Sequence, residues 1–143
     1  MPIDLQFYSN GVIIHESGII TDDEFIAAVE KIYDHDYEDG LQFQLADLSN
    51  VTDFRVSVDT MRDVGTRDLK ESKALPTQHL VVVAPPASYT RLMNEVWAIW
   101  VKDHQQMPSV RTNLVDAFSE ALEWLASRGV DIATQGRSSE ADS

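Results

Sequence analysis

The hydrophobic positions of the first forty residues predict a hairpin followed by a helix. Apolar residues gather in residues 3–8 and 12–16, on either side of Ser9-Asn10-Gly11. An Asn-Gly pair between two apolar runs is typical of a tight β-hairpin turn, because both residues tolerate positive φ. Residues 21–24 (TDDE) have the pattern of a capping box, and apolar residues at helical spacing follow to about residue 36.

From residue 41 onward the pattern alternates between strands and helices. Residues 41–48 alternate apolar and polar side chains and predict a strand, and residues 49–54 are expected to be a loop. Ser57 can cap a sparsely apolar helix that runs to about residue 72. Residues 79–84 form a continuous, mostly β-branched run, which is typical of a central strand covered on both faces.

The last third of the chain predicts two more helices with a short strand between them. The helices are expected at residues 87–104 and after Asp116, and the strand at residues 110–115. Asp116 is the expected N-cap of the last helix, and Gly129 is the expected residue just past its C-terminal end.

The predicted order β-β-α-β-α-β-α-β-α indicates an α/β fold. Alternation after an initial hairpin predicts a mixed, mostly parallel sheet of five strands packed with four helices. We expect one domain over residues 1–133, because 143 residues suffice for a single core. Residues 134–143 have almost no apolar side chains and are expected to be a disordered tail.

Composition and charge narrow the classes of partner. The chain has no cysteine, no apolar run near the roughly 18 residues of a membrane span, and no basic-then-apolar start typical of a secretory signal. We therefore expect a cytoplasmic protein without a membrane span. A formal net charge of −13 repels phosphate backbones, so nucleic acid is not an expected partner.

Cations are concentrated in one segment of this acidic chain. Residues 55–73 carry Arg55, Arg62 and Arg67 near Ser57, whereas residues 1–54 carry Lys31 as their one basic residue. A basic segment on an acidic body is a candidate surface for a protein partner.

The sequence gives no pattern typical of catalysis or of metal binding. The four histidines are widely spaced, and no phosphate-binding glycine loop or G-x-S-x-G motif is present. We therefore expect no metal, no cofactor and no catalytic residues, which makes an enzyme the least favoured class.

The helix expected at residues 87–104 is apolar around most of its circumference. One side is expected to carry Met93, Trp97, Trp100 and Val101, and another carries Leu92, Val96 and Ile99. Three interpretations stay open: both sides belong to the core, the first side forms a homodimer, or it holds a small apolar ligand. We expect self-association as a homodimer through this helix.

Residues 45–64 (LADLSNVTDFRVSVDTMRDV) resemble the central motif of STAS domains, the fold of the anti-sigma-factor antagonist SpoIIAA. The strand end Asp47-Leu48-Ser49-Asn50-Val51 matches well. The family's phosphoserine aligns with Ser57, but Arg55 and Val58 replace the acidic residue and the glycine that flank it. The resemblance therefore implies a STAS-like fold, and the differences predict that Ser57 is a helix N-cap without the phosphoserine switch.

The chain is more similar to the SpoIIAA-like group, also described as STAS/SEC14-like. The shared motifs are residues 18–24 (GIITDDE), 47–49 (DLS) and 121–125 (ALEWL), and the resemblance covers residues 2–128. It implies a non-enzymatic regulatory or protein-interaction module. The alternative is a carrier or sensor of a small apolar, lipid-like ligand held against Met93, Trp97 and Trp100. An apolar pocket beneath that helix would favour the alternative, and a closed, well-packed helix would favour the module. Buried carboxylates converging in a cleft would revive an enzyme.

Overall fold

Five strands and four helices make up the described part of the chain. The computed structural model describes residues 2–72, 78–86, 88–104 and 110–132, without the side chains of residues 72, 100–104 and 110. The elements are β1 (Ile3–Tyr8), β2 (Gly11–Thr21), α1 (Asp22–Asp34), β3 (Phe43–Arg55), α2 (Val58–Ser72), β4 (Gln78–Val83), α3 (Tyr89–His104), β5 (Val110–Val115) and α4 (Phe118–Ser127). The predicted order of elements is confirmed.

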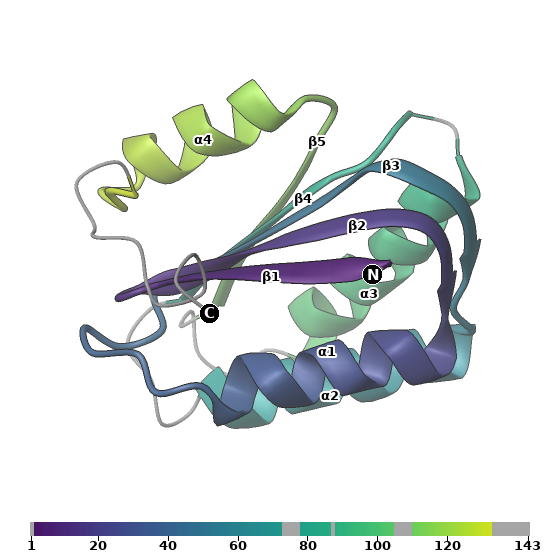
Figure 1. Cartoon of the computed structure of the whole chain (residues 1–143), viewed down its shortest axis with the longest axis horizontal. Coiled ribbons are helices and arrows are strands. Elements are labelled where there is room, and N and C mark those ends of the chain that lie inside the picture. Colours follow the sequence, from purple (N-terminus) through teal and green to yellow (C-terminus); the bar gives the residue numbers. More distant parts are fainter. Residues whose placement is uncertain (1, 73–77, 87, 105–109, 133–143) are drawn as a thin grey trace.

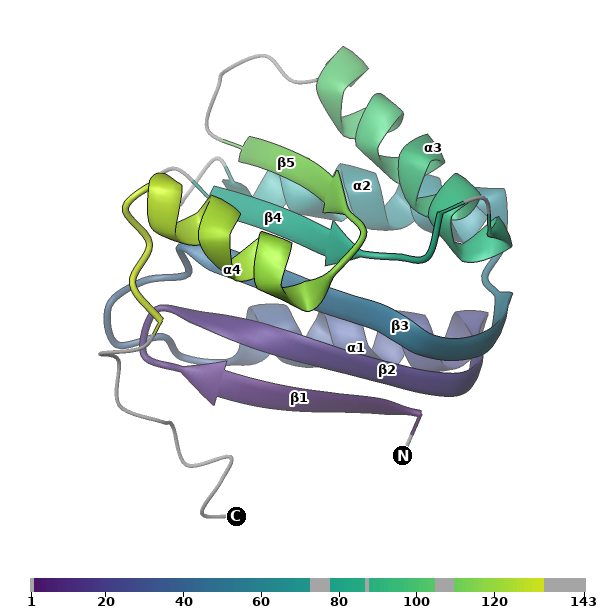
Figure 2. The ribbon, with the colours of Figure 1, turned by 90° about the horizontal axis from the view of Figure 1, so that it is seen from above.

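The strands form one mixed sheet in the order β1-β2-β3-β4-β5. β1 and β2 pair antiparallel, and β2, β3, β4 and β5 pair parallel. The crossover helices α1, α2 and α3 lie on one face of the sheet, and α4 lies on the other (Figures 1 and 2). The protein is therefore an α/β fold with a mixed, mostly parallel five-stranded sheet and four helices, as the pattern predicts.

The first hairpin turns at Ser9 and Asn10, and Gly11 already belongs to β2, paired with Tyr8. Gly11 is not among the glycines with positive φ in the described residues, so the predicted Asn-Gly turn is wrong in detail. Its lack of a side chain serves packing instead. A Cβ at this position would lie 2.2 Å from the Phe43 ring.

β3 is longer than predicted, because residues 49–54 continue the strand instead of forming a loop. This extension pairs with the second half of β2, from Ser17↔Asn50 to Thr21↔Arg55. Two register shifts each leave an extra residue on the β3 side, one between His15 and Ser17 and one after Gly18. Bulges of this kind bend a ladder and break the alternation that marks a strand in a sequence. Figure 1 shows both strands curving toward the start of α1.

Local motifs set the helix ends. The capping box predicted before α1 is confirmed, with Thr21 as N-cap and the Glu24 side chain accepting from the Thr21 N–H. Ser57 accepts a hydrogen bond from the Thr60 N–H, so its predicted capping role is confirmed. At α4 the N-cap is Ala117 and not Asp116, because Glu120 accepts from the Ala117 N–H at 3.0 Å. Gly129 follows the C-cap with φ of 82°, as predicted.

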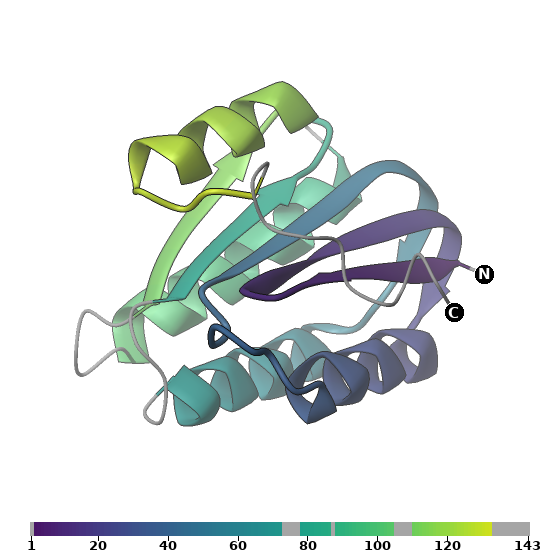
Figure 3. The same cartoon turned by 60° about the vertical axis from the view of Figure 1, so that its left-hand side comes forward.

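The core lies on both faces of the sheet. Alternate residues of β4 separate the two layers: Leu80 and Val82 pack toward α2 and α3, and Val81 and Val83 pack toward α4. α4 lies over the β3–β5 side of its face, and the β1–β2 hairpin extends beyond it (Figure 3).

Two further sequence predictions concern the C-terminal tail and membrane spans. The tail expected at residues 134–143 lies outside the described residues. Within the described ranges, no helix is both long enough and apolar enough to cross a membrane.

Candidate functional site

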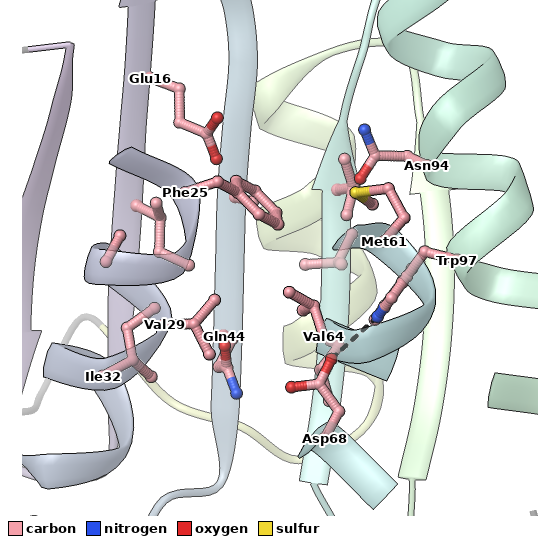
Figure 4. Close-up of a pocket in the computed structure, with 16 residues that line it drawn as sticks. Glu16, Phe25, Val29, Ile32, Gln44, Met61, Val64, Asp68, Asn94 and Trp97 are labelled. Atoms are coloured by element: carbon pink, nitrogen blue, oxygen red, sulfur yellow. Dashed lines mark hydrogen bonds between the residues drawn. The ribbon is translucent and has the colours of Figure 1, made fainter. Parts of the chain in front are cut away.

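An apolar cavity of about 60 Å³ lies between the sheet and the helices α1, α2 and α3. Figure 4 shows the residues that line it. The apolar lining comes from six elements: Ile14 on β2, Phe25, Ala28, Val29 and Ile32 on α1, Ala46 on β3, Met61 and Val64 on α2, Leu80, Val81 and Val82 on β4, and Trp97 on α3. The cavity exceeds the roughly 10–15 Å³ that one water molecule needs.

Glu16 is an acidic side chain buried in the wall of this apolar cavity. It follows Val12 and Ile14 on the same face of β2, at the first register shift with β3. The Glu16 side chain is 4% exposed, and none of the described groups donates a hydrogen bond to its buried Oε1. Burial, together with the smaller effect of the nearby Asp47 carboxylate, raises the pKa of the Glu16 carboxyl from 4.5 to about 8. At neutral pH the folded protein therefore holds Glu16 mainly as the neutral acid.

Asp68 is the second buried carboxyl, and its two oxygens are both occupied. The Trp97 Nε1–H donates to Oδ2 at 2.8 Å, and the Tyr33 hydroxyl donates to Oδ1. Burial raises the pKa of Asp68 to about 6, although both hydrogen bonds work in the opposite direction. Gln44 extends this network by donating to the Tyr33 hydroxyl at 3.1 Å. Asp68 therefore fixes α3 to α2 and to α1.

The two carboxyl groups lie at opposite ends of the cavity lining. Figure 4 places Glu16 at one end, beside Phe25, and Asp68 at the other, in contact with Trp97. They do not converge on one point, as an acid–base pair acting on a single bond would need to. Because both Asp68 oxygens already accept hydrogen bonds, Glu16 is the carboxyl group that can form one with a bound molecule.

The apolar side predicted on the third helix proves to be buried where it is described. Met93 and Trp97 are each 4% exposed and belong to the core beneath α3. Neither side chain is exposed to a second chain, so the prediction that these two residues form a homodimer surface is wrong. Trp97 does line the cavity, the alternative considered for it. The side chains of Trp100 and Val101 lie outside the described set.

The exposed apolar residues of α3 lie next to its buried side. Tyr89, Leu92 and Ile99 are 52%, 51% and 60% exposed. Their spacing places them within one arc of the helix, and Tyr89 lies one turn before the buried Met93.

The predicted basic surface is largely engaged in contacts within the chain. Arg67 pairs with Glu71 at 2.8 Å and with Glu30 of α1 at 3.6 Å, and its guanidinium lies over the Tyr33 ring. Arg67 therefore joins α2 to α1, and its side chain is only partly exposed.

The other members of this predicted surface lie near the start of α2. Arg55 is exposed and pairs with Asp53, and Arg62 is exposed with Asp59 at 3.9 Å. The Ser57 N–H donates to Asp22 of α1 at 2.8 Å. Each of these three residues thus already has an acidic neighbour.

Sequence reasoning missed Glu16 and Asp68, although a signal for each was present. Glu16 continues the alternation of Val12 and Ile14, which places it on the buried face of its strand. Asp68 continues the helical spacing of Met61 and Val64. An acidic residue in a buried register is rare and directs attention to that position.

Other parts of the described structure offer less for a ligand. A larger hollow of about 310 Å³ lies between β1 and α1, but its charged lining residues Asp4, Glu24 and Lys31 are partly or fully exposed. Among the described residues, no three histidine or acidic side chains cluster in a way that could hold a metal ion.

The sequence was also compared with known proteins. No protein-family model and no curated protein matches the chain.

Proposed function

We propose that the protein is a non-enzymatic sensor or carrier that binds a small, mainly apolar molecule in the cavity beneath α3. The observation that carries this proposal is the pairing of an apolar cavity with one buried carboxyl oxygen that has no partner. Ligand sites typically combine an apolar wall with a few polar groups that fix orientation.

The energetics of Glu16 favour a binding role over a purely structural one. A buried polar atom without a hydrogen bond costs roughly 1–3 kcal/mol, and replacing it with an apolar side chain would remove that cost. Asp68, by contrast, joins three helices through its hydrogen bonds. A bound molecule that forms a hydrogen bond to Glu16 would offset the cost of its unpaired buried oxygen.

A binding role also agrees better than catalysis with the placement of the carboxyl groups. Both Asp68 oxygens accept hydrogen bonds from protein groups, and Glu16 lies at the far end of the cavity. The residues that line the cavity support recognition of one apolar molecule with one polar group.

The test uses butan-1-ol as a small neutral probe, followed by NMR of methyl-labelled methionine. We expect butan-1-ol to shift the methyl resonance of Met61, which lines the cavity, and to raise the melting temperature. An Ala28→Leu variant places a larger side chain in the cavity and should abolish both effects. At about 24 cal/mol per Å³, filling 60 Å³ should also stabilise the free protein by up to about 1.4 kcal/mol.

The matched control is Ala27→Leu, one residue earlier on α1. Ala27 is exposed and does not line this cavity, so the variant should respond to butan-1-ol like the unaltered protein. The proposal fails if the Met61 resonance stays fixed at millimolar butan-1-ol, or if Ala28→Leu responds as strongly as the control.

A second candidate function, interaction with a protein, rests on the exposed side of α3. Tyr89, Leu92 and Ile99 form an apolar stripe on the helix whose other side carries Trp97. Exposed apolar patches of this kind are common at protein interfaces. Self-association is the simplest form, and Ile99→Asp should then convert a dimer seen by analytical ultracentrifugation into a monomer. A monomer at all micromolar concentrations before the substitution would exclude the homodimer.

A regulatory role of STAS type belongs to the same proposal, with a cytoplasmic location. Its support is the order of elements together with the Asp47-Leu48-Ser49 motif on β3. The Ser57 hydroxyl already accepts the Thr60 N–H, which fits a cap better than a phosphoserine switch. Ligand occupancy of the cavity, transmitted through α3, would then replace phosphorylation as the signal.

A further inference from the structure

The polar end of the cavity restricts the chemistry of the molecule that it can bind. Among the described lining residues, Glu16 is the one whose buried oxygen lacks a donor; Phe25 of α1 lies beside it, and Met61 of α2 and Asn94 of α3 line the same cavity (Figure 4). Asp47 on β3 adds a negative charge nearby. A ligand with a hydrogen-bond donor placed here would satisfy the buried Glu16 oxygen.

The charges around the cavity disfavour an anionic ligand. None of the described lining residues is Lys, Arg or His, and the acidic ones are Glu16 and Asp68. The whole chain has a formal net charge of −13. A carboxylate or a phosphate would meet no cation in the lining, whereas an ammonium group would favour the ionised form of Glu16.

We propose that the ligand of this cavity is a small primary amine, with its apolar body against Ile14 and Val29 and its ammonium group donating to the Glu16 carboxylate. This inference rests on the function proposed above, because it assumes that the cavity binds a ligand at all. It goes beyond that function by assigning the chemical class of the ligand and the residue that selects it.

The size of the cavity limits the apolar body. At 60 Å³ the cavity is well below the roughly 150 Å³ of an engineered cavity that takes up benzene. It has room for about four to six water-sized groups. A four-carbon amine therefore fills it, and butylamine is the natural probe.

The experiment compares three probes with the same apolar body by calorimetry at pH 7: butylamine, butan-1-ol and butanoate. We expect butylamine to bind at least about tenfold more tightly than butan-1-ol, because its hydrogen bond to Glu16 is charge-assisted. Butanoate should show no measurable binding. Glu16→Gln should lower the affinity for butylamine to that for butan-1-ol and change butan-1-ol binding little.

Proton release gives a second, independent readout. With a pKa of about 8, the Glu16 carboxyl is mainly protonated at pH 7 in the free protein. An alkylammonium group keeps its charge at this pH, so its pairing with the carboxylate releases up to about one proton per bound amine. Titrations in phosphate and in Tris, which differ in ionisation enthalpy, measure this number. Butan-1-ol should release none.

The outcomes separate the two proposals. If butan-1-ol binds as tightly as butylamine, or butanoate binds most tightly, the amine assignment is overturned and the cavity remains a ligand site. If butylamine binds without proton release, or equally to Glu16→Gln, Glu16 is not its partner and the assignment is also overturned. If none of the probes binds and the Met61 resonance stays fixed, the proposed function falls with it. Glu38→Gln, at an exposed acidic residue, is the matched control and should behave like the unaltered protein.

Discussion

Replacing Glu16 with glutamine should make the protein more stable, and increasingly so as the pH rises. Glutamine has nearly the shape of glutamate but carries no charge at any pH. In the unaltered protein the unfolded chain ionises Glu16 near pH 4.5, whereas burial delays its ionisation in the folded protein to about pH 8. The unfolded state therefore holds fewer protons than the folded state between these values, and stability falls as the pH rises through this window.

The expected magnitude follows from the two pKa values. Each factor of ten in the acid constant corresponds to about 1.4 kcal/mol, so moving the pKa from 4.5 to about 8 removes roughly 5 kcal/mol by pH 8. The loss is absent below pH 4.5 and constant above pH 8. Since small domains have about 5–15 kcal/mol of stability in total, an effect of this size is readily measured.

Urea unfolding of both proteins at each pH from 5 to 9 provides the assay. The free energy of unfolding of Glu16→Gln minus that of the unaltered protein should grow steadily with pH and level off near pH 8. Subtracting the two proteins cancels the contributions of the other titrating groups. A difference that stays constant from pH 5 to 9, or that grows toward low pH, would refute the assignment of Glu16 as a buried neutral acid. Glu38→Gln should show no such trend.

Three further predictions concern packing, capping and the buried network. Gly11→Ala should lower the free energy of unfolding by about 1–3 kcal/mol, because its Cβ would collide with the Phe43 ring, and adding Phe43→Leu should recover part of the loss. Ser57→Ala should cost about 1 kcal/mol in thermal unfolding through loss of the α2 cap, and mass spectrometry should find Ser57 unmodified after incubation with a STAS-directed kinase. Asp68→Ala should cost about 2–4 kcal/mol in urea, because two buried donors lose their acceptor, whereas Asp63→Ala at an exposed site of the same helix should change stability by less than about 0.5 kcal/mol.

Features that depend on neighbouring residues could be predicted from the sequence. The capping box at Thr21, the cap at Ser57 and the glycine after α4 follow from short motifs, and all three are present. The alternation of strands and helices likewise gives the mixed sheet without any long-range information. These elements are local because the chain itself supplies the hydrogen bonds that end or begin them.

Features that depend on distant partners could not be predicted. The second half of β3 pairs with β2 through two bulges, which erase the period of two that identifies a strand. The helix pattern leaves open whether Trp97 is in the core or on the surface; Asp68, which lies 29 residues earlier, fixes it in the core. The cavity itself lies where three helices meet the sheet. The pattern of apolar and polar residues does not indicate how well their side chains fill that space.

The order of the sheet has a consequence for how the protein folds. Every strand after β1 pairs with the strand before it in the chain, and one helix connects each parallel pair. Each parallel strand pair encloses one crossover helix and no other element, although most tertiary contacts still join residues far apart in the sequence. A chain emerging from the ribosome can add one strand at a time to a growing sheet, without waiting for a distant segment. In such an order α1 and α2 would pack onto the sheet before α3. The cavity would then close late, when the helix that carries Trp97 packs over it.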